Sequence, residues 1–320
     1  MFVSRSIETS ADVPMMRLGR TGDQSICDWI PLEQDWSQRW CTLPTRFIDY
    51  KERIDEFETL DGDVYVVSYM KSGNTWLLRL VWMMCNNLDF EMAKSNYLVS
   101  PRMEYLDTKS SVDSIDNCKE LNRPRVIKSH LPPQLLPHRI WQQAHKYIYI
   151  ARNPKDVIVS SYSFLTSIGL YLGDLDNFVD DFLNDKVLYT SYWTHVIDNW
   201  RMRNEPNIFF VTYEDMQRDF KAVIVNLIKF LELPSLTSIE IDKLIKHLSF
   251  ENIRAGKYTN PTQLIKDFEK STKDFNFMRR GIVGSYKDEL TALQIDMIDK
   301  WTADFLKQYE LQETDIFGQL

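Results

Sequence analysis

Residues 69–76 read Y-M-K-S-G-N-T-W and combine one lysine, one glycine and several short polar side chains. Lys71 supplies a full positive charge, and Gly73 allows the backbone to approach a ligand closely. The short side chains that add hydrogen-bond donors are Ser72, Asn74 and Thr75. This composition predicts a cradle for an oxyanion; the alternative is a capped helix start with an ordinary turn. The run is not a Walker A loop, G-x-x-x-x-G-K-[ST], because Lys71 precedes the only glycine.

A second run, K-S-H-L at residues 128–131, precedes two prolines and contains one of the five histidines. Imidazole has an unperturbed pKa of about 6.5, so it can accept a proton near neutral pH. Lys128 stands two residues before His130 and adds a positive charge. The run therefore predicts a general base beside an anion site. The alternative is a surface histidine or one satisfied within the core, which is the commoner situation for an isolated histidine.

Arginines suited to phosphate stand in two further runs, A-R-N-P-K-D at residues 151–156 and F-M-R-R-G at residues 277–281. The planar guanidinium group can hold a phosphate through two parallel hydrogen bonds. Arg152 and the pair Arg279–Arg280 are thus candidate ligands for an anionic substrate. Two simpler interpretations remain open, namely an ion pair between Arg152 and Asp156 and a solvated arginine pair in a loop.

Buried strands and amphipathic helices alternate between these runs. Asp63–Met70 is almost continuously apolar and rich in β-branched and aromatic residues, as in a parallel strand buried on both faces. Residues 74–87 form an apolar run that is too long for a strand and predicts a helix. Further strands are predicted at residues 125–128, 146–151 and 207–212, and further helices at residues 154–165, 189–203, 218–231, 238–247 and 288–309. The alternation predicts an α/β fold with a central, mainly parallel sheet flanked by helices.

Such a sheet binds ligands at the carboxyl ends of its strands, so the runs at 69–76, 128–131 and 151–156 are expected to face one space. Residues 1–45 carry several glycines and prolines without a clear periodicity. They predict an irregular arm, mobile or wrapping, packed on a domain that spans residues 46–320. The sequence contains no evident repeat, low-complexity tract or linker, which favours a single domain.

The 320 residues include 38 lysines and arginines and 46 aspartates and glutamates, which gives a net charge of −8. This acidity argues against a nucleic-acid partner, since non-specific nucleic-acid affinity comes from neutralised phosphates. Four cysteines without metal-ligand spacing predict reduced thiols and a cytoplasmic protein. No apolar run approaches the roughly 20 residues of a membrane helix, so no membrane partner is expected. The sequence also shows no carboxylate cluster suited to Mg²⁺, so no metal is expected.

The runs quoted above resemble motifs of the cytosolic sulfotransferases, over about residues 40 to 310. That family transfers a sulfuryl group from 3′-phosphoadenosine 5′-phosphosulfate (PAPS) to a hydroxyl or amine. Residues 69–76 are similar to its 5′-phosphosulfate loop, Y-P-K-S-G-T-T-W, with Met70 in place of proline and Asn74 in place of threonine. The resemblance implies a PAPS-dependent enzyme with a P-loop-like strand–loop–helix site and no metal. It also implies a small hydrophobic acceptor such as a phenol, a sterol or another alcohol, as in xenobiotic metabolism.

The resemblance further implies a role for each matching residue. The family carries its catalytic base in K-T-H-L, so His130 would accept the proton while Lys128 holds the sulfonate oxygens and Lys71 stabilises the leaving phosphate. The phosphosulfate would be bound by Lys71, Ser72, Gly73, Asn74, Thr75 and Trp76. The 3′-phosphate would be bound by Arg152 and Ser160 and by the run Phe277, Met278, Arg279, Arg280 and Gly281. The adenine would be bound by Trp76, Tyr213, Leu248, Ser249 and Phe250.

Three further positions depart from the family's nucleotide motifs. The run at 277–281 looks like the start of R-K-G-x-x-G-D-W-K, but Ser285 and Tyr286 stand where aspartate and tryptophan are usual. These changes affect the contacts that close the loop more than the phosphate contacts themselves. Leu248 stands where the family often has a threonine that reaches the adenine, so one polar contact is expected to be lost.

Further expectations concern the acceptor site, the oligomeric state and the alternative functions. An apolar acceptor slot near His130 is expected to use aromatic side chains, with Tyr162, Phe164, Tyr189 and Trp193 as candidates. Residues 287–296, K-D-E-L-T-A-L-Q-I-D, resemble the family's K-x-x-x-T-V-x-x-x-E dimer motif and suggest a weak homodimer. The alternatives are sulfonation-driven dehydration of an alcohol such as a retinoid, a nucleotide-dependent kinase, and a nucleotide-binding protein without turnover. A kinase would need a Walker-type loop and Mg²⁺ carboxylates, which the sequence does not show.

Overall fold

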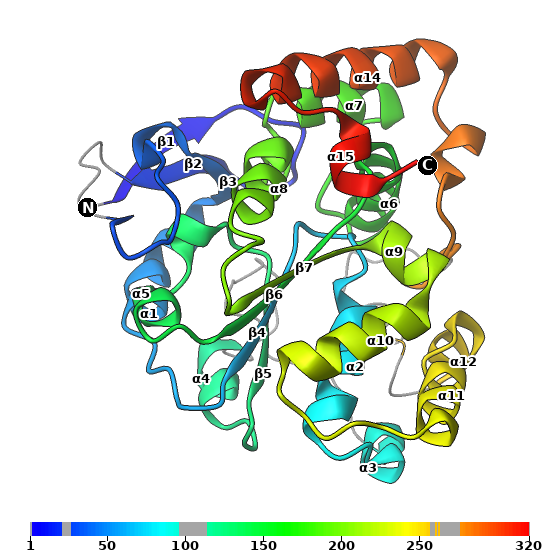
Figure 1. Ribbon diagram of the computed structural model, residues 1–320. Helices are drawn as coiled ribbons and strands as arrows, with labels where there is room; N and C mark the ends of the chain where they lie inside the picture. Colours follow the sequence, from blue (N-terminus) through cyan, green and yellow to red (C-terminus); the bar gives the residue numbers. More distant parts are fainter. Residues whose placement is uncertain are drawn as a thin grey trace.

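The computed structural model describes residues 2–20, 27–95, 114–256, 260, 262 and 276–319. Within these residues, the main sheet has four strands in the order β5-β4-β6-β7 (Figure 1). Every neighbouring pair in this sheet is parallel, which confirms the predicted α/β fold with a mainly parallel sheet. The strands are β4 (Val64–Val67), β5 (Val126–Ser129), β6 (Lys146–Ala151) and β7 (Ile208–Thr212).

The two faces of this sheet are buried against different helices, because successive side chains of a strand point to opposite faces. In β4, Val64 and Val66 belong to a core that includes side chains of α2 and α10. Tyr65 and Val67 belong to a second core that includes side chains of α6 and α8. All four side chains are buried, so the continuous apolar run does form a strand covered on both faces.

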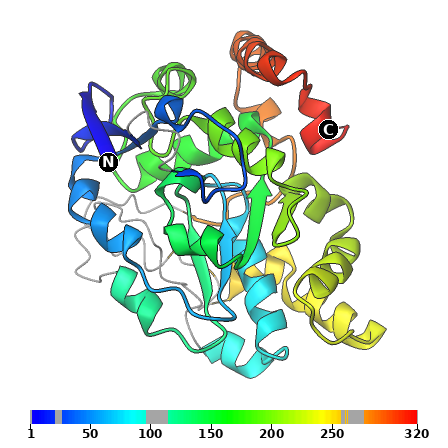
Figure 2. The same cartoon turned by 60° about the vertical axis from the view of Figure 1, so that its left-hand side comes forward.

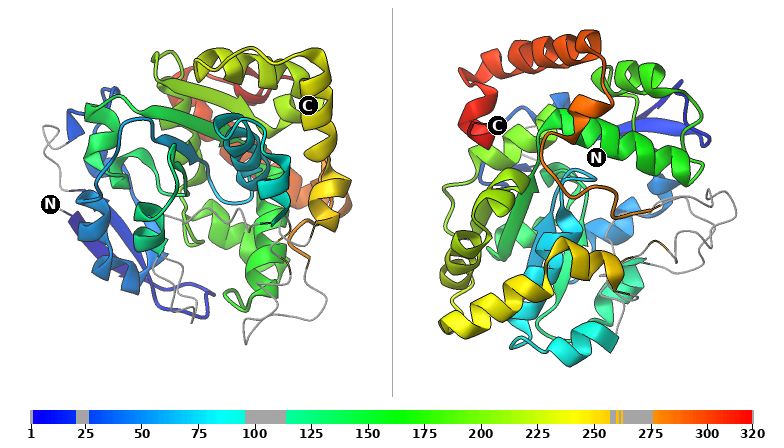
Figure 3. Two further views of the ribbon diagram at one scale, coloured as in Figure 1. Left: turned by 90° about the horizontal axis from the view of Figure 1, so that it is seen from below. Right: turned by 90° about the vertical axis from the view of Figure 1, so that its right-hand side faces the viewer.

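The helices fall into two groups, one for each face of the main sheet. Those that contribute to the core of Val64 and Val66 are α2 (Asn74–Cys85), α3 (Phe90–Ser95), α9 (Tyr213–Arg218), α10 (Phe220–Phe230), α11 (Ser238–His247) and α12 (Phe250–Ala255). Those that contribute to the core of Tyr65 and Val67 are α1 (Lys51–Asp55), α4 (Ser114–Lys119), α5 (His138–Gln142), α6 (Pro154–Ser167), α7 (Leu175–Leu183), α8 (Tyr192–Arg201), α14 (Ala292–Leu306) and α15 (Glu313–Phe317). Short 3-10 turns lie at Trp36–Gln38, Thr45–Asp49, Pro133–Leu135, Ser285–Asp288 and Lys307–Tyr309. Figure 3 shows α14 at the opposite end of the molecule from α3 and α11.

Two predicted helices start later than expected. The helix predicted from residue 189 begins at Tyr192, because Tyr189 has a φ of 67° and lies in the left-handed region that a helix excludes. The helix predicted at 288–309 begins at Ala292, where Thr291 and Gln294 form a capping box. A separate 3-10 turn, Ser285–Asp288, precedes it.

The N-terminal segment is not irregular, and that prediction is wrong. Within the described part of residues 2–44, three antiparallel strands pair in the order β1 (Phe2–Ile7), β2 (Met15–Arg20) and β3 (Cys41–Pro44). Gly19, one of the glycines of this segment, lies inside β2, where a Cβ would meet the Arg39 carbonyl at 3.1 Å. The glycine therefore permits a close approach within a strand rather than ending it. Figure 2 brings this small sheet, drawn in blue beside the N-terminus, to the front left.

The small sheet is joined to the main domain by backbone hydrogen bonds around Thr42. Its N–H donates to the Thr190 carbonyl at 2.7 Å, and its carbonyl accepts from the Tyr189 N–H at 2.7 Å. The Thr42 hydroxyl donates to the Asp185 carbonyl at 2.7 Å. The strand β3 thus holds the segment that precedes α8. In the described part of the chain, no helix is both long and apolar enough to cross a lipid bilayer.

Candidate active site

A cavity of about 390 Å³ lies where the carboxyl ends of β4, β5 and β6 meet the segment 277–285. Most of the residues singled out from the sequence line it, although they come from distant parts of the chain. Those residues are Lys71, Gly73, Asn74, Thr75, Trp76, Lys128, His130, Arg152, Ser160, Tyr213, Leu248, Phe250, Phe277, Met278, Arg279, Arg280 and Gly281. The expectation that the three strand-end runs face one space is therefore confirmed. Ser72 and Ser249 are not among the lining residues.

The loop after β4 depends on a glycine for its shape. Gly73 has a φ of 96° and precedes the first residue of α2, so a residue with a side chain would be strained there. A Cβ at this position would also lie 2.6 Å from Cδ2 of Tyr213. Lys71 extends its ammonium group over two rings, 3.9 Å from the centroid of Phe277 and 4.7 Å from that of Phe164. The lysine thereby bridges this loop and the segment around 277 through cation–π contacts.

Two of the expected donors in this loop, Asn74 and Ser72, have their polar atoms inside the protein. The Asn74 amide nitrogen donates to the Val66 carbonyl at 3.2 Å and to the Ser68 hydroxyl at 3.1 Å. Both amide protons are therefore engaged inside the protein, and because Asn74 also lines the cavity, its contact with the anion stays a prediction. The Ser72 hydroxyl is fully buried and finds no hydrogen-bond partner among the described residues.

His130 is held in one tautomer by the end of β4. Its Nδ1 lies 2.9 Å from the Ser68 carbonyl oxygen and 3.2 Å from the Ser68 hydroxyl. A carbonyl can only accept, so Nδ1 carries the proton and Nε2 is the basic nitrogen of the ring. The side chain is 5% exposed and its ring centroid lies 5.5 Å from that of Tyr189.

His195 forms a hydrogen bond to the backbone of His130, a contact that the sequence did not predict. Its Nε2 donates to the His130 carbonyl at 3.0 Å, and its Nδ1 accepts from the Tyr149 hydroxyl at 2.7 Å. Burial lowers the pKa of His195 to about 4, so the ring is neutral at physiological pH. The helix face of α8 carries this histidine inward, and only the folded structure brings it to the end of β5.

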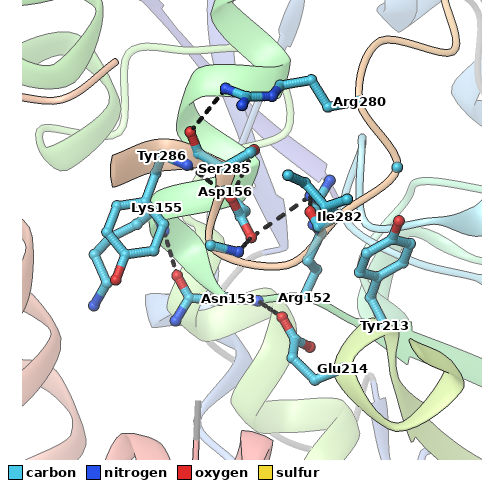
Figure 4. Close-up of polar contacts among 12 residues, drawn as sticks. Arg152, Asn153, Lys155, Asp156, Tyr213, Glu214, Arg280, Ile282, Ser285 and Tyr286 are labelled. Carbon is cyan, nitrogen blue, oxygen red and sulfur yellow. Dashed lines mark hydrogen bonds and ion pairs between the residues drawn. The ribbon is translucent and has the colours of Figure 1, made fainter. Parts of the chain in front are cut away.

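Arg152 takes part in both of the interactions considered for it. It lines the cavity, and it also pairs with Asp156 at 3.6 Å. Its guanidinium group donates to the Lys71 carbonyl at 3.3 Å and to the Ile282 carbonyl at 3.1 Å. It lies over the ring of Tyr213, 4.4 Å from the centroid. Arg152 thus joins the loop after β4 to the segment around 282, and Figure 4 shows it beside Ile282 and Tyr213.

The loop that carries Arg152 is fixed by two acids, of which Glu214 is buried and Glu313 is partly exposed. Glu214 accepts a hydrogen bond from the Asn153 N–H at 3.0 Å, and the Asn153 side chain donates to Glu313 of α15 at 2.6 Å. Burial raises the pKa of Glu214 to about 7, and the Asn153 N–H and Arg152 only partly oppose that rise. Burial likewise raises the pKa of Glu313. Neither acid was singled out from the sequence, because nothing local marks their proximity to Asn153.

Arg279 and Arg280 form ion pairs with carboxylates of the following turn. Arg279 pairs with Glu289, and Arg280 pairs with Asp288 at 2.5 Å. Gly281, between them and residue 282, has a φ of 69°, and a Cβ there would lie 2.3 Å from Cδ2 of Phe250. The glycine therefore lets the segment pass close to this ring. The two arginines thus lie in a loop, as one interpretation of the sequence had it, and they also line the cavity.

One end of the cavity is lined by aromatic and apolar side chains from α2, α9 and α12. The Trp76 ring lies 4.7 Å from that of Phe220 and 5.8 Å from that of Tyr213. Gln217 donates to the Tyr213 hydroxyl at 3.0 Å and to the Gly281 carbonyl at 3.1 Å. Ser249 instead caps α12, where its hydroxyl accepts from the Asn252 N–H. Lining residues that the sequence did not suggest are Gln217, Glu251 and Ile253.

Only two of the four aromatics considered for an acceptor slot line the cavity, namely Phe164 and Tyr189. Trp193 is fully buried in the core and donates to the Thr302 hydroxyl at 3.2 Å. Tyr162 packs on Phe178 with ring centroids 5.5 Å apart. Helical spacing alone could not separate these core aromatics from the lining ones. Further apolar lining comes from Met70, Leu188 and Ile282.

The cavity carries positive charge in an otherwise acidic chain. The cationic side chains that line it are Lys71, Lys128, Arg152, Arg279 and Arg280. Among the described residues, no group of three or more histidine, cysteine, aspartate or glutamate side chains is arranged to hold a metal ion. The donors therefore favour an anion beside an apolar surface.

Comparison with known proteins gives consistent results. Residues 61–311 match the family model described as a sulfotransferase domain. Luciferin sulfotransferase of Photinus pyralis is 34% identical over 287 residues, which cover 82% of this chain and 76% of that protein. Human sulfotransferase 1E1 is 32% identical over 270 residues, which cover 83% of this chain and 91% of that protein.

Solved structures share the fold. Retinol dehydratase in complex with retinol and PAP superposes with a TM-score of 0.83 at 23% identity, covering 97% of this chain and 98% of that one. Mouse sulfotransferase SULT7A1 complexed with PAP superposes with a TM-score of 0.68 at 23% identity, covering 88% and 96% of the two chains.

Proposed function

The chain belongs to the sulfotransferase domain family and is a transferase, and on that premise we propose that it moves a sulfuryl group from PAPS to a hydroxyl of a small hydrophobic acceptor. The observation that carries the proposal is the composition of one cavity. It joins a histidine with a defined basic nitrogen, cations from several segments, and apolar side chains suited to both an adenine and an acceptor. Phenols, sterols and other alcohols are the acceptor classes that we propose.

The lining side chains fit a 3′,5′-substituted adenine nucleotide. Nε of Arg152 and Nε1 of Trp76 are buried donors with no hydrogen-bond partner among the described residues. A nucleotide would supply the acceptor atoms that these donors lack. We propose that the loop after β4 binds the 5′-phosphosulfate, that Arg152, Ser160, Arg279 and Arg280 bind the 3′-phosphate, and that Trp76, Tyr213, Leu248 and Phe250 enclose the adenine.

The chemistry asks the protein for alignment, charge stabilisation and one base. PAPS supplies the sulfuryl group when bound. We propose that Nε2 of His130 accepts the proton of the acceptor hydroxyl, since the Ser68 carbonyl holds the other ring nitrogen in its protonated form. Lys71 and Lys128 provide positive charge where negative charge develops on the leaving oxygen and the sulfonate.

The acceptor class rests on the apolar lining around the histidine. Met70, Phe164, Leu188 and Tyr189 line the same cavity as His130, and a flat or elongated apolar molecule would bury these surfaces. The relatives' names mention luciferin and retinol, which are different molecules with hydroxyl groups. The proposal is therefore made for a class of acceptor rather than for one compound.

Calorimetry with 3′-phosphoadenosine 5′-phosphate tests the nucleotide, and an acceptor screen with PAPS tests the reaction. Phenols, sterols and long-chain alcohols should give sulfate esters by mass spectrometry, with activity retained in EDTA. The same screen separates transfer from sulfonation-driven dehydration, because an allylic alcohol would then give an alkene and free sulfate. Absence of nucleotide binding, or of both product types, would contradict the proposal.

Two wider proposals concern the environment of the protein. We propose a cytoplasmic location, supported by the four cysteines, which are all free thiols as expected in a reducing compartment. We also propose that residues 287–296 mediate a weak homodimer, supported by Leu293, whose side chain is 69% exposed. Microscopy of a tagged chain tests the first proposal. Sedimentation of Leu293→Asp beside the parent tests the second, and identical sedimentation would contradict it.

A further inference from the structure

Asp156 is a fully buried carboxylate on the first turns of α6, outside the set of residues assigned to binding or chemistry. Its oxygens accept hydrogen bonds from the Gly284 N–H at 2.8 Å, the Ser285 hydroxyl at 3.0 Å and the Tyr286 N–H at 3.1 Å. Figure 4 shows these groups converging on it from the segment that follows the arginine pair. A buried charge is retained only when it is satisfied in this way, so Asp156 fixes the segment to α6.

The same carboxylate pairs with one of the side chains proposed for the 3′-phosphate, Arg152, and shares a helix face with another, Ser160. On α6, Asp156 follows Arg152 by four residues and pairs with it at 3.6 Å. Ser160 follows Asp156 by another four residues and therefore lies on the same helix face. Both neighbours line the cavity.

On the other side, Ser285 extends the connection to the arginine pair. Arg279 donates to the Ser285 hydroxyl at 3.4 Å, and Arg280 donates to the Ser285 carbonyl at 3.5 Å. The hydroxyl of Ser285 thus donates to Asp156 and accepts from Arg279 at the same time. Ser285 is 2% exposed, so water does not replace these contacts.

We propose that Asp156 is a positioning residue that acts through Ser285 on Arg279 and Arg280, and so sets the preference of the cavity for nucleotides with a 3′-phosphate. The proposal rests on the proposed nucleotide function. Asp156 does not touch the ligand, because its oxygens are occupied by the segment 284–286 and by Arg152. It determines how far apart the two cationic groups stand, Arg152 just before α6 and the arginine pair at 279–280, and a phosphate must fit between them.

Calorimetry with 3′-phosphoadenosine 5′-phosphate and with adenosine 5′-phosphate measures this preference directly as the ratio of the two dissociation constants. Ser285→Ala removes one hydroxyl and should reduce the ratio by about 2- to 10-fold, the value of one hydrogen bond of ordinary net strength. Asp156→Asn removes the charge and should reduce it by about 10- to 100-fold. The double variant should match Asp156→Asn within about twofold, since the two residues act in series.

A matched control comes from Asp181, a buried carboxylate on α7 that accepts from the Tyr171 hydroxyl at 2.9 Å. Asp181→Asn should lower the melting temperature and leave the ratio unchanged. An unchanged ratio in both Ser285→Ala and Asp156→Asn overturns the proposal, because a merely structural carboxylate would behave in that way. If Asp156→Asn does not fold, Ser285→Ala decides alone. A parent protein without any preference for the 3′-phosphate overturns the proposed function itself, which is a distinguishable result.

Discussion

The loop after β4 and the segment 277–286 both bring cations to the cavity, but the protein positions them in different ways. The loop lies between a buried strand and a helix, and its shape follows from Gly73 and from the ends of β4 and α2. The segment has little regular structure and is held by side chains, chiefly Asp156, Arg152 and Gln217. The first is therefore part of the sheet framework, whereas the second depends on a few polar contacts. The two should respond differently to substitution, with chemistry failing in the first and nucleotide preference changing in the second.

The largest effect is expected for His130, which is held by the ends of β4 and β5. His130→Ala should reduce kcat by about 10²- to 10⁴-fold, because the acceptor hydroxyl loses its base. Binding of 3′-phosphoadenosine 5′-phosphate should persist, since the strand and loop remain. Turnover assays and calorimetry measure the two quantities. His145→Ala removes another buried imidazole, away from the cavity, and should keep full turnover. Near-normal kcat in the His130 variant would remove this residue from the mechanism.

The segment should lose affinity rather than turnover. Arg279→Ala should weaken binding of 3′-phosphoadenosine 5′-phosphate by about 10- to 100-fold, because a charge-assisted contact to the 3′-phosphate is lost. Adenosine 5′-phosphate, which lacks that group, should bind within about threefold of the parent value. Titration calorimetry measures both. Equal losses for the two nucleotides would show that Arg279 supports the segment without contacting the phosphate.

Alanine variants of two glycines, Gly73 and Gly62, distinguish the cost of backbone strain from that of a steric clash. Gly73→Ala combines a φ of 96° with a Cβ only 2.6 Å from Tyr213, and should lower the free energy of unfolding by about 1–3 kcal/mol. Gly62→Ala also places a side chain at a positive φ, 82°, but its Cβ meets nothing within 4 Å. The control should therefore cost about 1 kcal/mol. Denaturant unfolding measures both, and equal losses would show that Tyr213 moves aside without cost.

The smallest effect is expected for Glu214, the buried acid that accepts a hydrogen bond from the Asn153 N–H. Burial raises the pKa of Glu214 to about 7, so the folded protein binds more protons than the unfolded chain between about pH 4.5 and 7. This contribution to stability is present at low pH and is lost as pH rises through that window. Glu214→Gln should therefore gain stability relative to the parent from pH 5 to pH 8, by a few degrees in Tm. Scanning fluorimetry across this range measures the difference.

The exposed Glu232 provides the control for that pH series. The hydrogen bond from Lys146 lowers the pKa of Glu232, so Glu232→Gln should change the melting curve equally at every pH between 5 and 8. Parallel curves for Glu214→Gln as well would mean that Glu214 does not titrate in this range.

The sequence was informative where local patterns determine the structure. The apolar run through β4 and the glycine of the following loop place Lys71 at the cavity. His130 lies at the cavity because it directly follows another strand of the same sheet. It was uninformative where partners are distant. The connections of Asp156 depend on residues 128 to 130 positions later in the chain. The N-terminal strands were missed for a similar reason, because short strands with glycine and proline gain their regularity only from pairing.

The attachment of β3 to Tyr189 has a consequence for how acceptor preference can diversify. Because Thr42 bonds both to Tyr189 and to Thr190, the apolar wall formed by Leu188 and Tyr189 is built jointly by the N-terminal sheet and the main domain. The segments that we propose for the nucleotide lie elsewhere along the chain. A substitution in β3 can thus reach the wall of the cavity from outside it, through the backbone of residues 189 and 190.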